Sequence, residues 1–515
     1  MPEHAPYVIN FSDSLLRKLI QLKYELQKKK EIELEEEKRR QKQQEEERGE
    51  GEEEEEEENE EVSDLTNPND TPRQTTINDL PDKILIQILS HLPTFDAIGA
   101  SFISRRWRNL WFRVPALIFP NNYQTTLFIH RTINTRPPSS APLKKFALQL
   151  ERYGDVDTDL WIWLRYAINR SVQEIDLDIP TNFPHLSILT HPCIRVLKIT
   201  QRNSVLQDSN DFLRLKGSLT SLSLNTVRLS DDMVGELISG LDNLRSFSLE
   251  RCKGIKDVKI CSTRLRELKL RFFQEKEGSL EIDCPMLGVF TLERFEVGEY
   301  DIKKFSRLVE ARVSFLHKLE YYDTWLKVVT SFPRVMYLST QNWGPQLVLS
   351  KDLSDNSLLT NLRQLELETD FSKYDMLGVA SFLETSLYLE RLILKPLHST
   401  IDEGDYCEYF DLKKMKALFN KHINLSIPSL KEVELKEIKA TKSEAIFLSF
   451  LVLHGVALEK IDMTLLTEGL PEGVSLPPVT IRRLLPQEKI CREEAKNVKF
   501  DLVEDGIHTV YKKKK

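Results

Sequence analysis

Residues 244–270, LRSFSLERCKGIKDVKICSTRLRELKL, contain the same short pattern twice. The first copy places apolar side chains at Leu244, Phe247 and Leu249, and the second repeats that spacing from residue 265 to residue 270. Alternating apolar and polar residues are typical of a short β-strand with one buried face, because successive side chains on a strand point to opposite sides. The two copies start 21 residues apart, which lies within the range of periods that repeat proteins use.

The pattern occurs thirteen times along the chain. Its copies begin at residues 143, 172, 194, 219, 244, 265, 287, 308, 335, 362, 389, 430 and 458. Eleven of the twelve intervals measure 21 to 29 residues. The remaining interval, from residue 389 to residue 430, measures 41 residues. It contains an acidic, aromatic segment at 402–411, which we expect to be an inserted loop. One unit cannot bury its apolar face alone, so the units must stack. The spacing therefore predicts an α/β leucine-rich-repeat solenoid with parallel strands on its concave face.

The longer units have room for a helix on the convex side. Amphipathic segments at 232–241, 322–329, 375–383 and 443–454 fit this position, as does 159–168, whose two tryptophans we interpret as core rather than as a ligand cage. The units of 21 and 22 residues are expected to return as extended or short 3₁₀ segments. Because the asparagine of the usual repeat is largely missing, we expect an irregular arc.

Residues 77–119 predict a different kind of unit, made of three short helices. The first carries a broad apolar stripe, Ile84, Leu85, Ile88, Leu89 and Leu92. Pro93 ends it, Thr94 is expected to cap a second helix at about 95–103, and Ser104 a third that carries Trp107, Leu110 and Trp111. A unit of about 40 residues buries too little surface to be stable alone. It must therefore pack against the rest of the chain or against a partner.

This stretch resembles an F-box, and its end, SRRWRNLW at 104–111, resembles the plant version. The matching features are the Leu-Pro-Asp at 80–82, the apolar pairs at 84–85 and 88–89, and the Leu-Pro-Thr at 92–94. The sequence departs from the family pattern at two places: Lys83 stands where the family usually has Glu, and Phe102-Ile103 stand where it often has Val-Leu. The resemblance implies docking onto the Skp-type adaptor of a cullin-RING ubiquitin ligase. The residues it assigns to this contact are Leu80, Pro81, Ile84, Leu85, Ile88, Leu89, Leu92, Trp107 and Leu110. The alternative is a helical subdomain that uses these side chains as its own core.

The remaining boundaries follow from composition and from a second resemblance. Residues 1–75 are expected to be a low-complexity, largely disordered tail with partly helical segments, since 31–61 carry a net charge of −13. The F-box is assigned to 76–119 and the leucine-rich repeats to 120–425. Residues 426–485 resemble the FBD domain of plant F-box/leucine-rich-repeat proteins, and 486–515 form a C-terminal tail.

Several functional classes find no support in the sequence. No apolar run is long enough for a membrane span. The chain outside residues 31–61 carries a net charge of only +5, which does not indicate a nucleic-acid-binding protein. The six cysteines form no CxxC pair, which suggests an intracellular protein, nuclear or cytoplasmic, without a zinc site. Nucleotide-binding, metalloprotease and hydrolase motifs are missing, so we expect neither catalysis nor a cofactor nor a metal.

Two hypotheses for function remain. The first is a substrate-recognition subunit of an SCF-type ubiquitin ligase, in which the F-box docks on the adaptor, and through it on a cullin, while the repeats hold an unknown target protein. The second is a repeat scaffold or ligand receptor that does not lead to degradation. Outward positions on the predicted strands carry mixed charges; of these, Lys269 and Arg271 are the candidate target-binding residues.

Overall fold

The computed structural model describes residues 77, 80–120, 126–150, 157–179, 191–201, 210–315, 321–343, 361–369, 371, 373–397, 427–438, 444, 447–448, 450–451, 455, 457–465 and 479–482. The predicted N-terminal tail (1–75), inserted loop (402–411) and C-terminal tail (486–515) lie outside the described residues.

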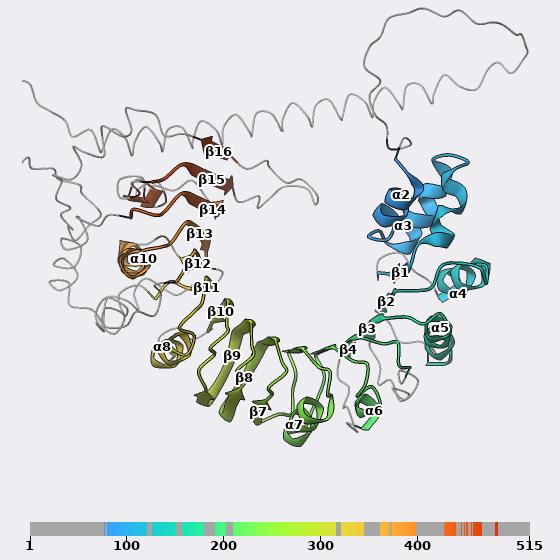
Figure 1. The fold of residues 1–515 in the computed structure, drawn as a ribbon, viewed down its shortest axis with the longest axis horizontal. Helices are drawn as coiled ribbons and strands as arrows, with labels where there is room; N and C mark the ends of the chain where they lie inside the picture. Colours follow the sequence, from blue (N-terminus) through green and yellow to red (C-terminus); the bar gives the residue numbers. More distant parts are fainter. Residues whose placement is uncertain are drawn as a thin grey trace, which may run out of the picture.

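The described strands form one continuous sheet of sixteen strands that follows chain order, except that β7 lies off the main path and pairs only with β8. Neighbouring strands are parallel, as in the pairing of Leu222 on β5 with Phe247 on β6; only β15 and β16 are antiparallel. The sheet curves into an arc with strands on its inner side, and the F-box lies at one end (Figure 1). This architecture confirms the predicted α/β solenoid.

All thirteen predicted repeat copies form strands of this sheet. The strands are β1 (Ala116–Phe119), β2 (Lys145–Gln149), β3 (Glu174–Ile179), β4 (Val196–Gln201), β5 (Ser221–Asn225), β6 (Ser246–Glu250), β7 (Asp257–Cys261), β8 (Glu267–Asp283), β9 (Val289–Ile302), β10 (Glu310–Ser314), β11 (Tyr337–Gln341), β12 (Gln364–Thr369), β13 (Arg391–Pro396), β14 (Glu432–Ile438), β15 (Lys460–Leu465) and β16 (Val479–Arg482). Three of them, β1, β7 and β16, were not predicted.

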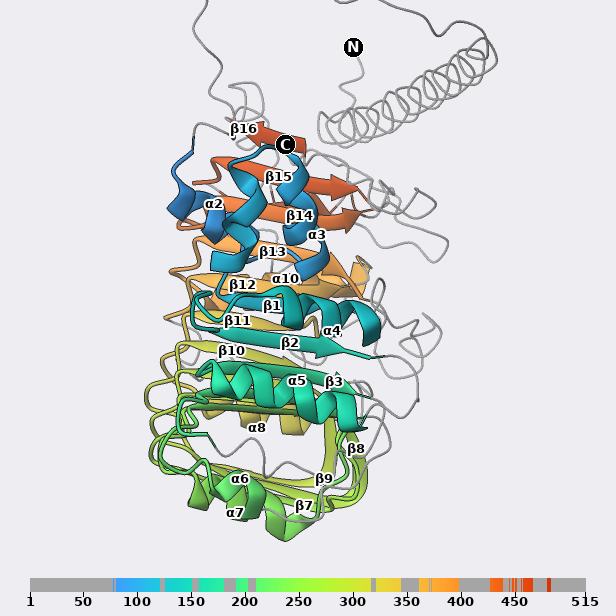
Figure 2. The ribbon, with the colours of Figure 1, turned by 90° about the vertical axis from the view of Figure 1, so that its right-hand side faces the viewer.

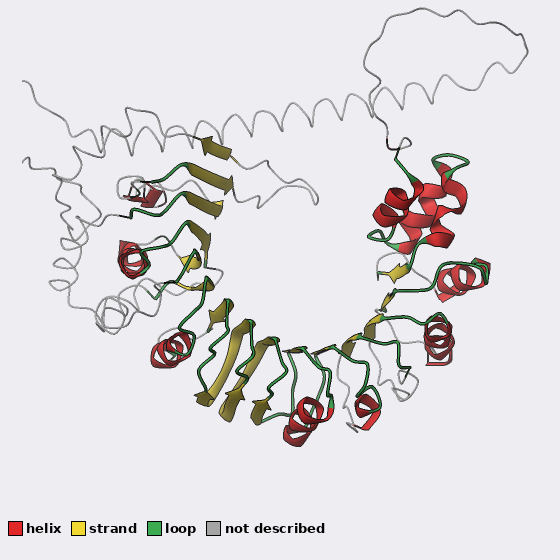
Figure 3. Ribbon diagram, in the orientation of Figure 1, coloured by secondary structure: helices red, strands yellow, loops and turns green. Residues whose placement is uncertain are grey.

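Helices cover the outer side of the arc, as Figures 2 and 3 show for α4 and α5 near the F-box and for α7, α8 and α10 farther along. Their bounds are α4 (Thr126–Thr135), α5 (Asp157–Asn169), α6 (Asn210–Leu213), α7 (Asp231–Gly240), α8 (Tyr322–Thr330) and α10 (Lys373–Thr385). None of the described helices combines the length and hydropathy needed to cross a bilayer. On α5, Trp163 is fully buried as predicted, but Trp161 is 37% exposed beneath the Arg165 guanidinium, so its assignment to the core was wrong.

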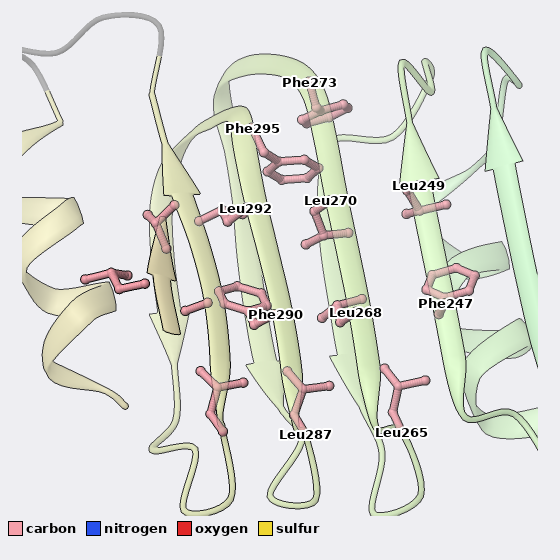
Figure 4. Close-up of a cluster of buried hydrophobic side chains, with 14 of the residues drawn as sticks. Phe247, Leu249, Leu265, Leu268, Leu270, Phe273, Leu287, Phe290, Leu292 and Phe295 are labelled. Atoms are coloured by element: carbon pink, nitrogen blue, oxygen red, sulfur yellow. The ribbon is translucent and has the colours of Figure 1, made fainter. Parts of the chain in front are cut away.

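The buried side chains of successive repeats lie in rows across the sheet. Leu268 on β8 stands opposite Phe247 on β6 and Phe290 on β9, and all three are fully buried. Figure 4 shows these residues pointing to the same side of the sheet. Farther along the strands, Phe273 stacks on Phe295 with ring centroids 4.6 Å apart. The inward positions of the repeat pattern are therefore the core, as the alternation predicts.

The three consecutive units that begin at residues 244, 265 and 287, of 21, 22 and 21 residues, return as strands rather than as helices. β7 pairs with the 279–283 part of β8, and this part of β8 pairs in turn with the end of β9. This confirms the expected extended return. The small sheet brings backbones very close together at two glycines: a Cβ on Gly278 would lie 2.1 Å from the Lys256 carbonyl oxygen, and one on Gly298 would lie 2.2 Å from that of Lys276. No other residue fits at these positions without backbone movement.

This close approach leads to a stability prediction. Gly278→Ala should destabilise the arc by about 1–3 kcal/mol, because the new methyl group meets a backbone carbonyl rather than a flexible side chain. Gly235→Ala on α7 is the matched control, since nothing lies within 4 Å of its Cβ position. Alanine is favoured over glycine inside a helix by about 0.5–1 kcal/mol, so this control should be slightly stabilised. Thermal melting of the two variants tests this prediction. Equal melting temperatures would refute the close packing of β7 against β8.

Candidate functional site: the F-box face and the concave sheet

Helix α2 (Asp82–Leu89) divides its apolar side chains between two environments. Leu85 and Leu89 are 0% and 1% exposed, whereas Ile84 and Ile88 are 40% and 37% exposed. Successive residues of a helix lie about 100° apart, so these two pairs occupy opposite edges of one broad apolar stripe. The first edge packs inside the F-box. The second edge is open to a partner.

The nine residues predicted to contact the adaptor therefore do not share one surface. Leu85, Leu89, Trp107 and Leu110 form the F-box core, 0–3% exposed, together with Ala97 and Val114. Their assignment as direct contacts is corrected, because an apolar stripe wide enough to hold five residues also has to fill the core of its own module. Leu80 packs partly buried against the same cluster. Pro81, Ile84, Ile88 and Leu92 are exposed and stay candidates.

Three exposed apolar residues that were not assigned to the contact lie in or beside the helices that come after α2. The helices are α3 (Thr94–Gly99), η2 (Ala100–Phe102) and η3 (Trp107–Arg113). Phe102 is 90% exposed, Ile103 52% and Phe95 48%. The signal in the sequence was the apolar pair at 102–103, next to a basic segment, where no core position was predicted. Exposed apolar side chains that gather on one module, rather than a single such residue, mark an interaction surface.

Asp82 ties the beginning of α2 to the end of the F-box. Its carboxylate accepts hydrogen bonds from Arg106 at 2.7 Å and from Arg113 at 3.1 Å, and Arg106 also donates to the Leu80 carbonyl oxygen at 2.6 Å. The hydrogen bond from Arg106 holds the pKa of Asp82 below its usual value. The Leu-Pro-Asp sequence therefore has a structural role: it fixes the entry to α2 and so the direction in which Ile84 and Ile88 point.

The F-box is joined to the arc by shared hydrogen bonds. β1 follows η3 directly and pairs with β2, so the sheet begins at 116. Thr94 does not cap α3 as expected; it is buried, and its hydroxyl accepts a hydrogen bond of 2.7 Å from the backbone N–H of Ile118. Arg136, 4% exposed after α4, donates to the carbonyl oxygens of Phe112 and Val114. These contacts fix the orientation of the F-box relative to the repeats.

The outward positions of the strands form the concave face, and most of their charges are paired. Lys269 lies 2.6 Å from Glu267, and Arg271 lies 2.8 Å from Glu293. Both cations stand on β8 and are partly exposed, so the structure places these two predicted residues on the concave face, with carboxylate partners. Farther along the arc, Lys395 bridges two glutamates of β12 at 2.7 and 3.2 Å.

The pKa values of two partly buried carboxylates on the concave face shift in opposite directions. Burial raises the pKa of Asp176 on β3, because the neighbouring cations do not fully offset the loss of water. Burial also acts upward on the pKa of Glu366 on β12, but the hydrogen bond from Lys395 and the charges of the nearby cations together outweigh it, and the pKa is lowered. The electrostatic environment therefore differs from strand to strand along the concave face.

Comparison with known proteins places both parts of the chain. Residues 77–118 match the F-box domain, and residues 138–469 match the family described as "At1g61320/AtMIF1, LRR domain". The Arabidopsis thaliana F-box/FBD/LRR-repeat protein At5g56420 is 29% identical over 47% of this chain and 60% of its own length. The putative F-box/LRR-repeat protein At3g18150, also from Arabidopsis thaliana, is 26% identical over 66% of this chain and 76% of its own length.

The matched region thus spans about 60% of the length of At5g56420 and of At1g22000, a putative F-box/FBD/LRR-repeat protein from the same plant. The C-terminal FBD-like assignment at 426–485 stays a prediction, although FBD appears in the names of these two relatives. The matched family domain covers more than half of the chain and coincides with the parallel sheet described above. The chain belongs to the plant-type F-box/leucine-rich-repeat family.

Proposed function

We propose that this protein is a substrate receptor of an SCF-type cullin-RING ubiquitin ligase. The exposed Ile84 and Ile88, with Phe102, support docking of the F-box on a Skp-type adaptor and through it on a cullin, while the concave sheet holds a target protein. The chain itself carries out no covalent chemistry. It acts by bringing its target close to the ubiquitin-charged enzyme, so that an intermolecular reaction becomes an effectively intramolecular one.

One observation carries this proposal: the F-box keeps an apolar side open although the rest of it packs against its own core and the arc. Ile88 is 37% exposed and Phe102 90% exposed, in a module whose core residues are almost fully buried. Exposed apolar groups of this kind become binding anchors when a partner covers them. The fixed joint at Thr94 and Arg136 supports the second half of the proposal, because it holds the arc at a defined angle to the adaptor.

The buried cysteines fit the expected intracellular setting, nuclear or cytoplasmic. Burial raises the pKa of the Cys252 thiol to about 11 and that of the Cys284 thiol to about 12. Both thiols therefore stay protonated and unreactive at neutral pH. Cys252 has a structural role instead, since its Sγ donates to the Leu224 carbonyl oxygen at 3.4 Å.

The test is affinity capture of the tagged chain from plant cells with and without a proteasome inhibitor. A substrate receptor should gain a ubiquitinated partner when degradation is blocked. A chain carrying Ile84→Asp and Ile88→Asp is the matched control, because it should retain the target to the same extent under both conditions. Equal recovery of every partner from the unmodified chain, with and without the inhibitor, would favour the non-degradative scaffold instead.

A further inference from the structure

A row of basic side chains lies along one side of the arc, where β5 and β6 end and where β8 and β9 continue to residues 283 and 302. A cavity of about 690 Å³ opens there, and its lining includes Arg228, Arg251 and Lys253 as well as Phe272. The guanidinium groups of Arg251 and Arg294 lie 4.2 and 5.8 Å from the Phe272 ring centroid. We call Arg228, Arg251, Lys253 and Arg294, all exposed, the basic ledge.

The register of the sheet aligns four neighbouring repeats at this level, and three of them supply the cations of the ledge. Asn225, Glu250, Arg271 and Glu293 pair across the strands, and the residue after each of them has a positive φ. The four residues in this conformation are Thr226 (55°), Arg251 (51°), Phe272 (54°) and Arg294 (50°). A left-handed conformation costs a non-glycine residue about 1–2 kcal/mol. This conformation occurs at the same level in all four strands, where β5 and β6 end and β8 and β9 continue, and it places these side chains in a row.

Gly254 completes the ledge by bringing the following loop against it. Its φ is +83°, and a Cβ there would lie 2.7 Å from the Leu229 carbonyl oxygen and 2.9 Å from Arg228 Cγ. Only glycine therefore lets the loop that carries Lys253 pack on the stem of Arg228. The two cations come from neighbouring repeats and meet at the same cavity.

The charges on this side of the arc are not paired to the extent seen on the concave face. Glu250 accepts a hydrogen bond from Arg251, and Glu275 lines the cavity. Among the described residues, the ledge has one ion pair, between Arg251 and Glu250. Over the part of the chain that the structure describes, Arg228, Lys253 and Arg294 have no ion-pair partner, whereas Lys269 and Arg271 on the neighbouring concave face are both paired.

We propose that the basic ledge binds an acidic segment of polypeptide. Guanidinium groups bind carboxylates through paired hydrogen bonds, and cations in a row suit several carboxylates rather than one. From β5 to β9 the ledge spans three strand spacings, about 14 Å. That is the length of about four residues of extended chain, which a single small anion cannot cover.

The acidic segment has two sources. It can belong to the target, in which case the ledge deepens the proposed function by naming the chemistry of target recognition and rests on that function. It can also belong to this chain, because ten of the twelve residues at 50–61 are glutamate. In that case the tail competes with targets for the ledge.

The test measures fluorescence anisotropy of a labelled peptide with the sequence of residues 50–61, titrated with the full chain bound to its adaptor. Arg228→Glu with Lys253→Glu should weaken binding by about tenfold or more, and added salt should weaken it further. The matched control is Arg245→Glu with Arg266→Glu. These exposed arginines precede β6 and β8, at the opposite ends of the strands, so the same charge is reversed on one shared and one adjacent repeat. The control should bind within about twofold of the unmodified chain.

A further variant identifies the source. In it, the ten glutamates of 50–61 are replaced by glutamine in the full chain. Tighter binding of the probe would show that the tail occupies the ledge; equal binding would leave the ledge to an acidic target segment.

Three results would overturn the proposal: unchanged binding by the ledge variant, an equal loss in the control, or equally strong competition by an oligonucleotide of the same charge. Adaptor co-purification is measured in parallel for every variant, so that a failure of the ledge is distinguished from a failure of the proposed function.

Discussion

Leu268→Asp should unfold the middle of the arc. Leu268 is fully buried on β8 between Phe247 and Phe290 of the neighbouring strands. An aspartate at this position places a carboxylate among apolar side chains with no cation to pair it, at a cost of about 3–5 kcal/mol. Each repeat is stabilised mainly by its neighbours, so the loss should spread to adjacent units rather than stay local. Circular dichroism during thermal melting should show a large fall in melting temperature.

Ser248→Asp is the matched control for this prediction. Ser248 lies on β6 and points outward, and it stands opposite Lys269 in the sheet register. The same carboxylate would there remain in contact with water and next to a cation, so stability should change by less than about 1 kcal/mol. If both variants melt at the same temperature, the register that pairs β6 with β8 is wrong, and the concave-face assignment of Lys269 and Arg271 is wrong with it.

The repeats could be predicted because their signal is redundant. A single apolar triplet such as 265–270 is common in any leucine-rich chain, but thirteen copies at similar intervals require a stack. The sequence also predicted which units return without a helix, since the interval from residue 265 to residue 287 is too short to hold one. The helices at 232–241 and 322–329 followed from their own amphipathic pattern and from the longer units that contain them.

Strands β1, β7 and β16 were missed for identifiable reasons. β1 (ALIF) does carry the pattern, at Val114, Leu117 and Phe119, but these residues were assigned to the F-box and not to the repeats. β7 (DVKIC) does alternate, with Val258 and Ile260 buried, but it lies between two copies already assigned to strands. β16 pairs antiparallel with β15, an arrangement that a parallel repeat does not predict.

The candidate sites depended on information that periodicity does not contain. The stripe on α2 places Ile84 next to Leu85, and only the packed F-box shows which of the two faces its own core. The basic ledge joins Arg228, Lys253 and Arg294, which are 25 and 41 residues apart in sequence. Only the strand register brings them together, and for this reason the sequence alone showed no cluster of basic residues.

The largest expected effect on binding concerns the open edge of α2. Ile84→Asp with Ile88→Asp should abolish detectable binding of a Skp-type adaptor, because truncated interface anchors typically cost about 2 kcal/mol or more each, and a buried carboxylate adds a desolvation penalty. The melting temperature should stay close to that of the unmodified chain, since both side chains already contact water. Lys83→Asp with Gln87→Asp, on the polar side of the same helix, should leave adaptor binding intact.

The direct measurement is isothermal titration calorimetry of a purified Skp-type adaptor into the full chain and into these two double variants. Our account predicts saturable one-to-one binding to the unmodified chain and to the Lys83/Gln87 variant, and no measurable heat with the Ile84/Ile88 variant. Binding of unchanged affinity by the Ile84/Ile88 variant would contradict the assigned F-box face. No binding by the folded, unmodified chain would contradict the proposed receptor function itself.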